Sequence, residues 1–349
     1  MLTAAAFLSA AAAGLLSAGC GSSGGYHDTS PMWSPGGRMI AFTRIREGEL
    51  GDLYVMRSDG TEVRRLAHDA TNPAWSPDGE RVAFDVLATD SDGLLADEVW
   101  MVDVDDGSLK RLTRNTVDDY HPAWSPDGTE LAFVRGGIAE TSTLAVMNLA
   151  SKKVRVVFGE RLHSSEKLWP TWSPDGRRLA FVAGIFPERL FLVDADGGGG
   201  RKIAVPSSIE QIGPPRWFPD GRSIVLNGGP VGLSDRGEIY RVDANGRGLA
   251  RLTNDRLTDT ADDWSPHGDR VLFTAGPPDD PDRVEIYSIG ANGAGRVRLT
   301  KNDVDDEGGD ISPDGSRIAF SRDSGDGLLR IHVMDSQGDH VRKLTYDSP

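Results

Sequence analysis

Residues 75–79 read Trp-Ser-Pro-Asp-Gly, and the same five residues return at 124–128 and 172–176. Close variants begin at Trp33, Trp217, Trp264 and Ile311. We call the first residue of each of these seven copies the anchor; successive anchors are 42 to 49 residues apart. Proline sets φ for the second position of a tight turn, aspartate tolerates the third, and glycine takes the left-handed conformation that closes a hairpin. The stretch therefore predicts seven copies of one structural unit, each with a turn at the same place.

An alternating apolar pattern follows each turn. Seven residues after the anchors stand Ile40, Val82, Leu131, Leu179, Ile224, Val271 and Ile318. Two residues further on stand Phe42, Phe84, Phe133, Phe181, Leu226, Phe273 and Phe320. A period of two places both side chains on one face of a β-strand, so each unit continues with a strand that has one buried face.

Two further strands complete each unit. In the fifth unit, residues 239–242 read Ile-Tyr-Arg-Val, Asn245-Gly246 mark a turn, and Arg251-Leu252-Thr253 end a fourth strand. Four short antiparallel strands in about 40 to 50 residues are typical of a β-propeller blade. The sequence thus predicts an all-β fold, a seven-bladed β-propeller of four-stranded antiparallel blades, with the anchor Trp side chains packed between neighbouring blades. Each blade is continuous in sequence, so we expect side-chain packing rather than strand exchange to close the ring.

The repeated motifs resemble the WD-type repeats of the TolB-like β-propeller family. Blades of that family carry Pro-x-Trp-Ser-Pro-Asp-Gly, then Ile-Ala-Phe, then Ile-Tyr-Val-Met-Asp, then Arg-Leu-Thr, and the resemblance covers residues 31–345. The departures are Gly36, Phe218, His267 and Ile311, all of which keep a turn feasible. The resemblance implies a TolB-like propeller over residues 31–349.

Composition limits the classes of partner. The 349 residues carry 53 acidic and 38 basic side chains, a formal charge of −15. Such a surface repels phosphate unless it concentrates basic residues, and no run of five Lys or Arg occurs, so we expect no nucleic-acid partner. The 42 glycines and 20 prolines fit many short elements joined by tight turns.

The N-terminus reads as a targeting segment. Residues 1–19 carry no charged side chain and end in Leu16-Ser17-Ala18-Gly19 before Cys20, the single cysteine, which resembles a bacterial lipobox. We therefore expect a signal peptide over residues 1–19, lipidation of Cys20 and a flexible tether over residues 20–30. An uncleaved anchor and an ordinary signal peptide are the alternatives. Each of the three places the body of the protein outside the cytoplasm, and the first makes it a periplasmic or surface lipoprotein of the bacterial cell envelope.

Acidic residues recur five or six positions before the anchors, in the loops that enter each innermost strand. The candidate binding residues are Asp28, Asp69, Asp118, Asp119, Glu166, Asp259, Asp305 and Asp306. Arranged around the mouth of a propeller, these carboxylates would attract a basic protein or peptide, or an amine. The alternative is that each Asp accepts backbone N–H bonds within its own loop.

Histidines also fall in these loops. His27, His68, His121 and His163 stand beside the carboxylates, a composition that transition-metal sites share, but they come from different units without a fixed ligand spacing. The Asp-rich stretches 103–107 and 303–310 do not match an EF-hand loop. We therefore expect no metal site and no cofactor.

No catalytic constellation stands out in the sequence. The expected function is a non-enzymatic, lipid-anchored scaffold that binds an envelope protein or peptide. A metal-assisted hydrolase or lyase that uses the acid and His groups at the funnel mouth is one alternative. A carbohydrate-binding surface module is the other, with Tyr26, Tyr120, Trp169 and Phe186 as candidate aromatic contacts. TolB-like propellers also resemble the gating domains of prolyl-oligopeptidase-type peptidases, whose hydrolase domain we would expect after blade seven.

Overall fold

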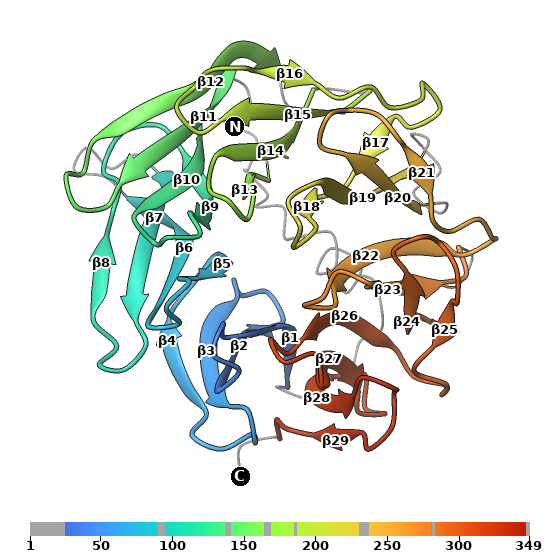
Figure 1. Ribbon diagram of the computed structural model, residues 1–349. Coiled ribbons are helices and arrows are strands. Elements are labelled where there is room, and N and C mark those ends of the chain that lie inside the picture. The colour runs from blue at the N-terminus through green and yellow to red at the C-terminus, as the bar shows by residue number, and fades with distance from the viewer. Residues whose placement is uncertain are drawn as a thin grey trace.

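The computed structural model describes residues 25–89, 95–136, 141–163, 169–184, 187–229, 237–278, 280 and 283–346. In this part of the chain seven antiparallel sheets are arranged around a common axis (Figure 1). The prediction of a seven-bladed propeller of four-stranded blades is confirmed. The expected signal peptide, Cys20 and Glu166 lie outside the described residues. No helix within the described ranges is long and apolar enough to span a membrane.

The strands follow one another blade by blade. Blade one holds β1 (Tyr26–Trp33), β2 (Met39–Arg46), β3 (Asp52–Arg57) and β4 (Arg64–Ala67); blade two holds β5 (Thr71–Trp75), β6 (Arg81–Thr89), β7 (Leu95–Asp103) and β8 (Leu109–Arg111). Blade three holds β9 (Asp119–Trp124), β10 (Glu130–Arg135), β11 (Thr141–Asn148) and β12 (Val154–His163); blade four holds β13 (Thr171–Trp172), β14 (Arg178–Ala183), β15 (Arg189–Asp194) and β16 (Arg201–Lys202). Blade five holds β17 (Gln211–Ile212), β18 (Arg216–Trp217), β19 (Ser223–Gly229), β20 (Glu238–Asp243) and β21 (Ala250–Arg251). Blade six holds β22 (Thr258–Trp264), β23 (Arg270–Gly276), β24 (Glu285–Gly290) and β25 (Val297–Arg298); blade seven holds β26 (Asp306–Ile311), β27 (Arg317–Asp323), β28 (Leu329–Asp335) and β29 (Arg342–Lys343).

The innermost strand of blade five is divided. Both β17 and β18 pair with β19, and Pro214 and Pro215 stand between them. Proline has no backbone N–H to donate to the ladder, so the strand is interrupted there. Every other blade keeps the simple order of four consecutive strands.

The ring closes without strand exchange. Blade one uses only β1 to β4 and blade seven only β26 to β29, and Figure 1 shows the blue and red blades side by side. We call this junction the seam. Strand β1 begins at Tyr26, so residues 26–30, expected in the tether, belong to blade one. The reason is that Tyr26 and Asp28 are buried and have partners inside the fold.

The predicted turns form as their residues require. In blade two the N–H of Gly79 donates to the carbonyl of Ser76 at 2.9 Å, and the Ser76 hydroxyl accepts the N–H of Arg81. The turn glycines all have positive φ, between 65° and 73°: Gly37, Gly79, Gly128, Gly176, Gly221, Gly268 and Gly315. An L-residue with a side chain is strained in this region, which explains why glycine ends each motif.

The anchor tryptophans join neighbouring blades, as expected. The indole Nε1–H of Trp75 donates to the carbonyl of Met32 at 3.2 Å, and Trp124 donates to Ala74 at 3.0 Å. Trp172, Trp217 and Trp33 make the same bond to Ala123, Thr171 and Asp310 of the preceding blades. The bond from Trp33 crosses the seam. Each of these five indoles therefore satisfies its polar atom and joins one blade to the next.

Candidate functional site

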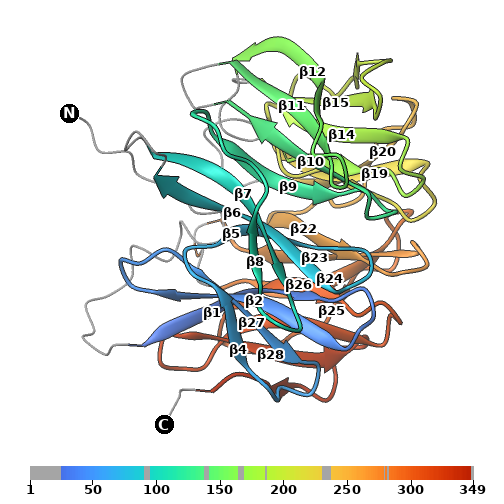
Figure 2. The same cartoon turned by 90° about the vertical axis from the view of Figure 1, so that its left-hand side faces the viewer.

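Two sets of loops share one face of the ring. Because the strands alternate in direction, the loops between second and third strands lie on the same side as the loops that connect successive blades. We call this side the loop face. Figure 2 shows it to the left, where the hairpin of β6 and β7 projects. The His and acidic residues singled out in the sequence come from these loops or from the strand ends beside them.

Three of the sequence-predicted acids are buried and paired with arginine. Asp28 accepts two hydrogen bonds from Arg44, at 2.6 and 2.9 Å. The same two-bond pairing joins Asp119 to Arg135, both bonds 2.8 Å long, and Asp306 to Arg322 at 2.5 and 2.8 Å. In each pair the two residues stand opposite each other on the first and second strands of a blade. These carboxylates are neutralised within the blades instead of facing solvent.

Asp259 occupies the equivalent position in blade six, but no arginine stands opposite it on the second strand. Its partner on the second strand is Ala275, and Arg296 approaches from blade six's own outer hairpin to 3.9 Å. The Arg296 guanidinium also pairs with Asp255 and lies 4.5 Å from the centre of the Tyr287 ring. Burial raises the pKa of Asp259 to about 7. This carboxyl is therefore a buried group that titrates near neutral pH.

The other predicted acids lie in the loops. Asp118 accepts the N–H of Asp97 at 3.1 Å, and Asp305 accepts the N–H of Val284 at 2.9 Å. These bonds join each loop to the hairpin of the preceding strands, 21 residues away in sequence, instead of capping the loop itself as the sequence alternative proposed. Asp69 is exposed and lies beside a pocket in blade one, and its N–H donates to Asp52.

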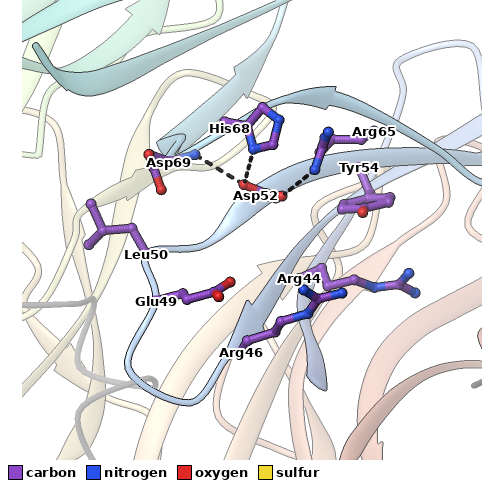
Figure 3. Close-up of a pocket in the computed structure, with 9 residues that line it drawn as sticks. All are labelled: Arg44, Arg46, Glu49, Leu50, Asp52, Tyr54, Arg65, His68 and Asp69. Carbon is purple, nitrogen blue, oxygen red and sulfur yellow. Dashed lines mark hydrogen bonds and ion pairs between the residues drawn. The ribbon is translucent and has the colours of Figure 1, made fainter. Parts of the chain in front are cut away.

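The blade-one pocket is a cavity of about 270 Å³ on the loop face (Figure 3). It opens between the loop that joins β2 to β3 and the loop that follows β4. Its lining residues are Arg44, Arg46, Glu49, Leu50, Asp52, Tyr54, Arg65, His68 and Asp69. Apart from Leu50 and Tyr54 every side chain is charged or is a histidine, so the pocket suits a strongly polar ligand.

Asp52 is the centre of one wall of this pocket. Its carboxylate accepts hydrogen bonds from Arg65 Nη1 at 3.1 Å and from the N–H of Asp69 at 3.2 Å. His68 Nδ1 lies 3.3 Å from Asp52 Oδ1, the oxygen that also accepts the Asp69 N–H, and the imidazole is 65% exposed. A carboxylate at Nδ1 fixes the tautomer that carries its proton there and turns Nε2 outward as a base. Figure 3 shows Arg46 and Glu49 on the opposite wall. Within the described residues Arg46 forms no ion pair.

Blade one lacks a hydroxyl that the equivalent places of blades two and five have. In blades two and five the equivalent acids, Glu98 and Glu238, pair with Arg111 and Arg251 and also accept the hydroxyl of the Thr two residues further on. In blade one the residue that follows Arg65-Leu66 is Ala67, which has no hydroxyl. Asp52 therefore keeps an oxygen for His68, while the N–H of Asp69 takes the place of the Asn115 N–H that Glu98 accepts in blade two.

The sequence singled out His68 and Asp69 but missed Asp52, Arg46, Glu49 and Arg65. The signal that finds Asp52 is the alignment of the units: in blades one, two, five and six, where Arg-Leu ends the fourth strand, an acid stands at the same place of the third strand. Arg46 and Glu49 carry no such signal, because they belong to a loop whose length differs between blades.

The histidines are not brought together. His27 Nδ1 accepts the N–H of Leu329 across the seam, and the N–H of His121 donates to Asp85. The His121 ring lies between Tyr120 and Trp169, at 5.0 and 6.0 Å. The side chains of His163 and Phe186 fall outside the described residues. No three His, Cys, Asp or Glu side chains of the described chain gather in an arrangement that could hold a metal ion.

Comparison with solved structures shows the same fold in proteins of several kinds. An oligogalacturonate lyase from Vibrio parahaemolyticus matches at a TM-score of 0.68 and 14% identity, covering 90% of this chain and 92% of that one. An oligogalacturonate lyase in complex with manganese matches at 0.68 and 16%, with 89% of each chain covered. The β-propeller domain of the Trilobed protease from Pyrococcus furiosus, described as having an open velcro topology, matches at 0.69 and 18%, covering 93% of this chain and 99% of that one. The described residues of this chain include no group of three or more His, Cys, Asp or Glu side chains that could bind manganese.

One curated relative is similar over a short segment. The uncharacterized peptidase YuxL of Bacillus subtilis is 50% identical over 38 residues, which are 11% of this chain and 6% of that protein. These findings correct the expectation of a non-enzymatic scaffold, because the proteins that share the fold or the repeat include lyases and peptidases, beside TolB itself.

The family model described as the TolB beta propeller domain matches residues 20–197 and 159–348, nearly the whole chain. The motifs, the seven blades and this match agree. The chain belongs to the TolB β-propeller family.

Proposed function

We propose that the protein is a lyase-type enzyme that cleaves a uronate-containing oligosaccharide in the blade-one pocket. The observation that carries the proposal is the contact of His68 with Asp52, on the wall that faces Arg46 (Figure 3). It keeps the acid and His groups of the lyase alternative but differs from that alternative, which was metal-assisted, in that no step uses a metal.

The pocket has the groups that β-elimination requires. The reaction removes a proton from the carbon that carries the sugar carboxylate, so it needs a base and a cation that stabilises the developing negative charge. Asp52 contacts Nδ1 of His68, which leaves Nε2 as the ring nitrogen that can act as the base. Arg46 supplies the guanidinium that a carboxylate binds in a two-bond geometry.

The step balances within the pocket. The electron pair of the broken carbon–hydrogen bond forms the new carbon–carbon double bond, and the neighbouring glycosidic carbon–oxygen bond breaks. The His68 imidazolium then returns the proton to the leaving oxygen. One histidine thus serves as base and acid, and no co-reactant is consumed.

The polar lining also suits a sugar. Arg46 and Arg65 donate hydrogen bonds, whereas Glu49 and Asp69 accept them, and a hydroxyl can do both. The structural match to the oligogalacturonate lyase, which extends over 90% of this chain and 92% of that one, supports the same class.

Substitution of His68 tests the proposal. With a uronate oligosaccharide as substrate, His68→Gln lowers kcat by about 10²–10⁴-fold, the usual contribution of a general acid or base. Asp52→Asn lowers it by removing the anion that fixes the imidazole, and Arg46→Gln both lowers kcat and raises KM, because the guanidinium binds the substrate carboxylate and stabilises the charge that develops on it.

His340→Gln is the matched control, because His340 Nδ1 also contacts an aspartate, Asp335, at 2.8 Å in an exposed turn of blade seven. Its activity should equal that of the wild type. Equal losses in His68→Gln and His340→Gln, or no cleavage by the wild type of any uronate oligosaccharide, would overturn the proposal.

A further inference from the structure

Tyr26 lies between two arginines that come from opposite sides of the seam. Its ring centre is 3.8 Å from Arg44 Cζ of blade one and 4.9 Å from Arg330 Cζ of blade seven. The Tyr26 hydroxyl donates to the carbonyl of Tyr346 at 2.8 Å, which ties β1 to the chain that follows blade seven. Cation–π contacts of this kind strengthen when they are removed from water, and Tyr26 is buried.

Arg330 is a departure from the repeat. It occupies the place of Glu98, Glu238 and Glu285, which pair with arginines of their own blades. In blade seven the residue at that place is itself a cation, so it cannot pair with Lys343 of its own outer strand. The fully buried Arg330 instead donates across the seam to the carbonyl of Tyr26 at 2.5 Å.

The same contacts reach the blade-one pocket. Arg44 lines the pocket and lies 4.6 Å from the centre of the Tyr54 ring, which lines it too. Arg330, Tyr26, Arg44 and Tyr54 therefore form a continuous stack from blade seven to the pocket wall. Because no strand crosses the seam, side-chain contacts such as these hold the two blades together.

We propose that Tyr26 is a positioning residue that couples closure of the seam to the shape of the blade-one pocket. When blade seven withdraws Arg330, Tyr26 loses one of its two guanidinium partners and no longer holds Arg44 and Tyr54 in place. Thermodynamic linkage makes the effect reciprocal, so a ligand in the pocket closes the seam. The inference rests on the pocket named in the proposed function.

Hydrogen exchange tests the coupling without any substrate. In Arg330→Met and Tyr26→Leu, amide exchange in residues 44–54 should rise by about fivefold or more, the lower end of typical coupling. Tyr26→Phe keeps the ring between the guanidiniums and should exchange in that segment as the wild type does. Faster exchange confined to blade seven in Arg330→Met would overturn the inference.

Arg155→Met is the matched control. Arg155 also donates to a carbonyl across a blade junction, that of Ala195 at 2.9 Å, but far from the pocket. Exchange in residues 44–54 should not change in this variant. A rise equal to that in Arg330→Met would show general loosening of the ring and overturn the coupling.

Steady-state kinetics provides a second measurement, which a purely structural role of the seam contacts would leave unchanged. Arg330→Met should raise KM by about fivefold or more and leave kcat unchanged, since His68 and Asp52 are untouched. A fall in kcat at constant KM contradicts the positioning role. If the wild type cleaves no uronate, the proposed function fails, and the exchange data still decide for or against the coupling.

Discussion

Asp263 accepts the backbone N–H of Ile311 at 2.8 Å, at the blade junction whose anchor is not a tryptophan. One blade further on, Asp310 accepts the N–H of Trp33 at 2.6 Å, across the seam. The two aspartates also hydrogen-bond each other, and burial raises the pKa of both. The negative charge of Asp263 raises the pKa of Asp310 further. A carboxylate thus replaces the missing indole at one junction and reinforces the indole bond at the next.

The shared proton predicts that stability falls as pH rises. A carboxyl whose pKa is higher in the folded than in the unfolded state binds more protons when folded, and that stabilisation is lost as pH rises from its ordinary value of 3.8 through the raised value. Asp262, whose pKa burial raises to about 7, acts in the same direction. The melting temperature should therefore fall as the pH rises from 3.8 to about 7.

Asp310→Asn tests this origin, because an amide accepts from Trp33 and donates to Asp263 at every pH. The dependence of the melting temperature on pH should become shallower in this variant. An unchanged slope in thermal melts would place the titrating group elsewhere.

Breaking a buried pair on the loop face should cost far more than removing an exposed acid of the same loop. Asp306→Ala leaves Arg322 without its carboxylate and should lower the free energy of unfolding by about 3–5 kcal/mol. Asp303→Ala, three residues away and 98% exposed, should change it by less than about 0.5 kcal/mol. Urea denaturation measures both, and similar values would mean that the arginine pair contributes little.

Restoring the consensus threonine in blade one should impair the site. Ala67→Thr provides a hydroxyl that donates to Asp52, as Thr113 does to Glu98 at 2.5 Å, and this bond competes with His68. We expect kcat to fall by about tenfold or more while the melting temperature holds. The reverse change, Thr113→Ala in blade two, should lower stability and leave activity alone. An active Ala67→Thr enzyme would show that His68 does not need Asp52.

The location of the protein outside the cytoplasm remains a prediction. If Cys20 carries a lipid, Cys20→Ser expressed in a bacterium moves the protein from the membrane fraction to the soluble envelope fraction. The reason is that a diacyl anchor binds a protein stably to the membrane, and the variant lacks this anchor. Cell fractionation followed by immunoblotting measures which fraction holds the protein. A wild-type protein already soluble contradicts lipidation.

The fold could be predicted because each decisive residue acts locally. Gly79 needs its left-handed φ whatever surrounds it, and the period of two that places Ile40 and Phe42 on one face follows from strand geometry. The candidate site could be predicted only in part. His68 and Asp69 were visible as loop residues, but the role of Asp52 depends on Ala67, a missing hydroxyl that matters only once the strands are paired.

The burial of the acids depended on partners that lie far away in sequence. From the sequence alone, three acids were expected to face solvent: Asp28, Asp119 and Asp306. The structure places an arginine opposite each of them on the next strand, namely Arg44, Arg135 and Arg322. That each of these arginines follows its anchor by eleven residues was available in the repeat. The seam contact of Arg330 with Tyr26 was not, because it joins residues 304 positions apart.

The masses of the reaction products test the central claim most directly. The purified protein is incubated with a galacturonate oligosaccharide, and the products are weighed by mass spectrometry. β-Elimination at the His68 site predicts two products whose masses sum to that of the substrate, one of them unsaturated. Products that have gained one water molecule, or an intact substrate, would contradict the account.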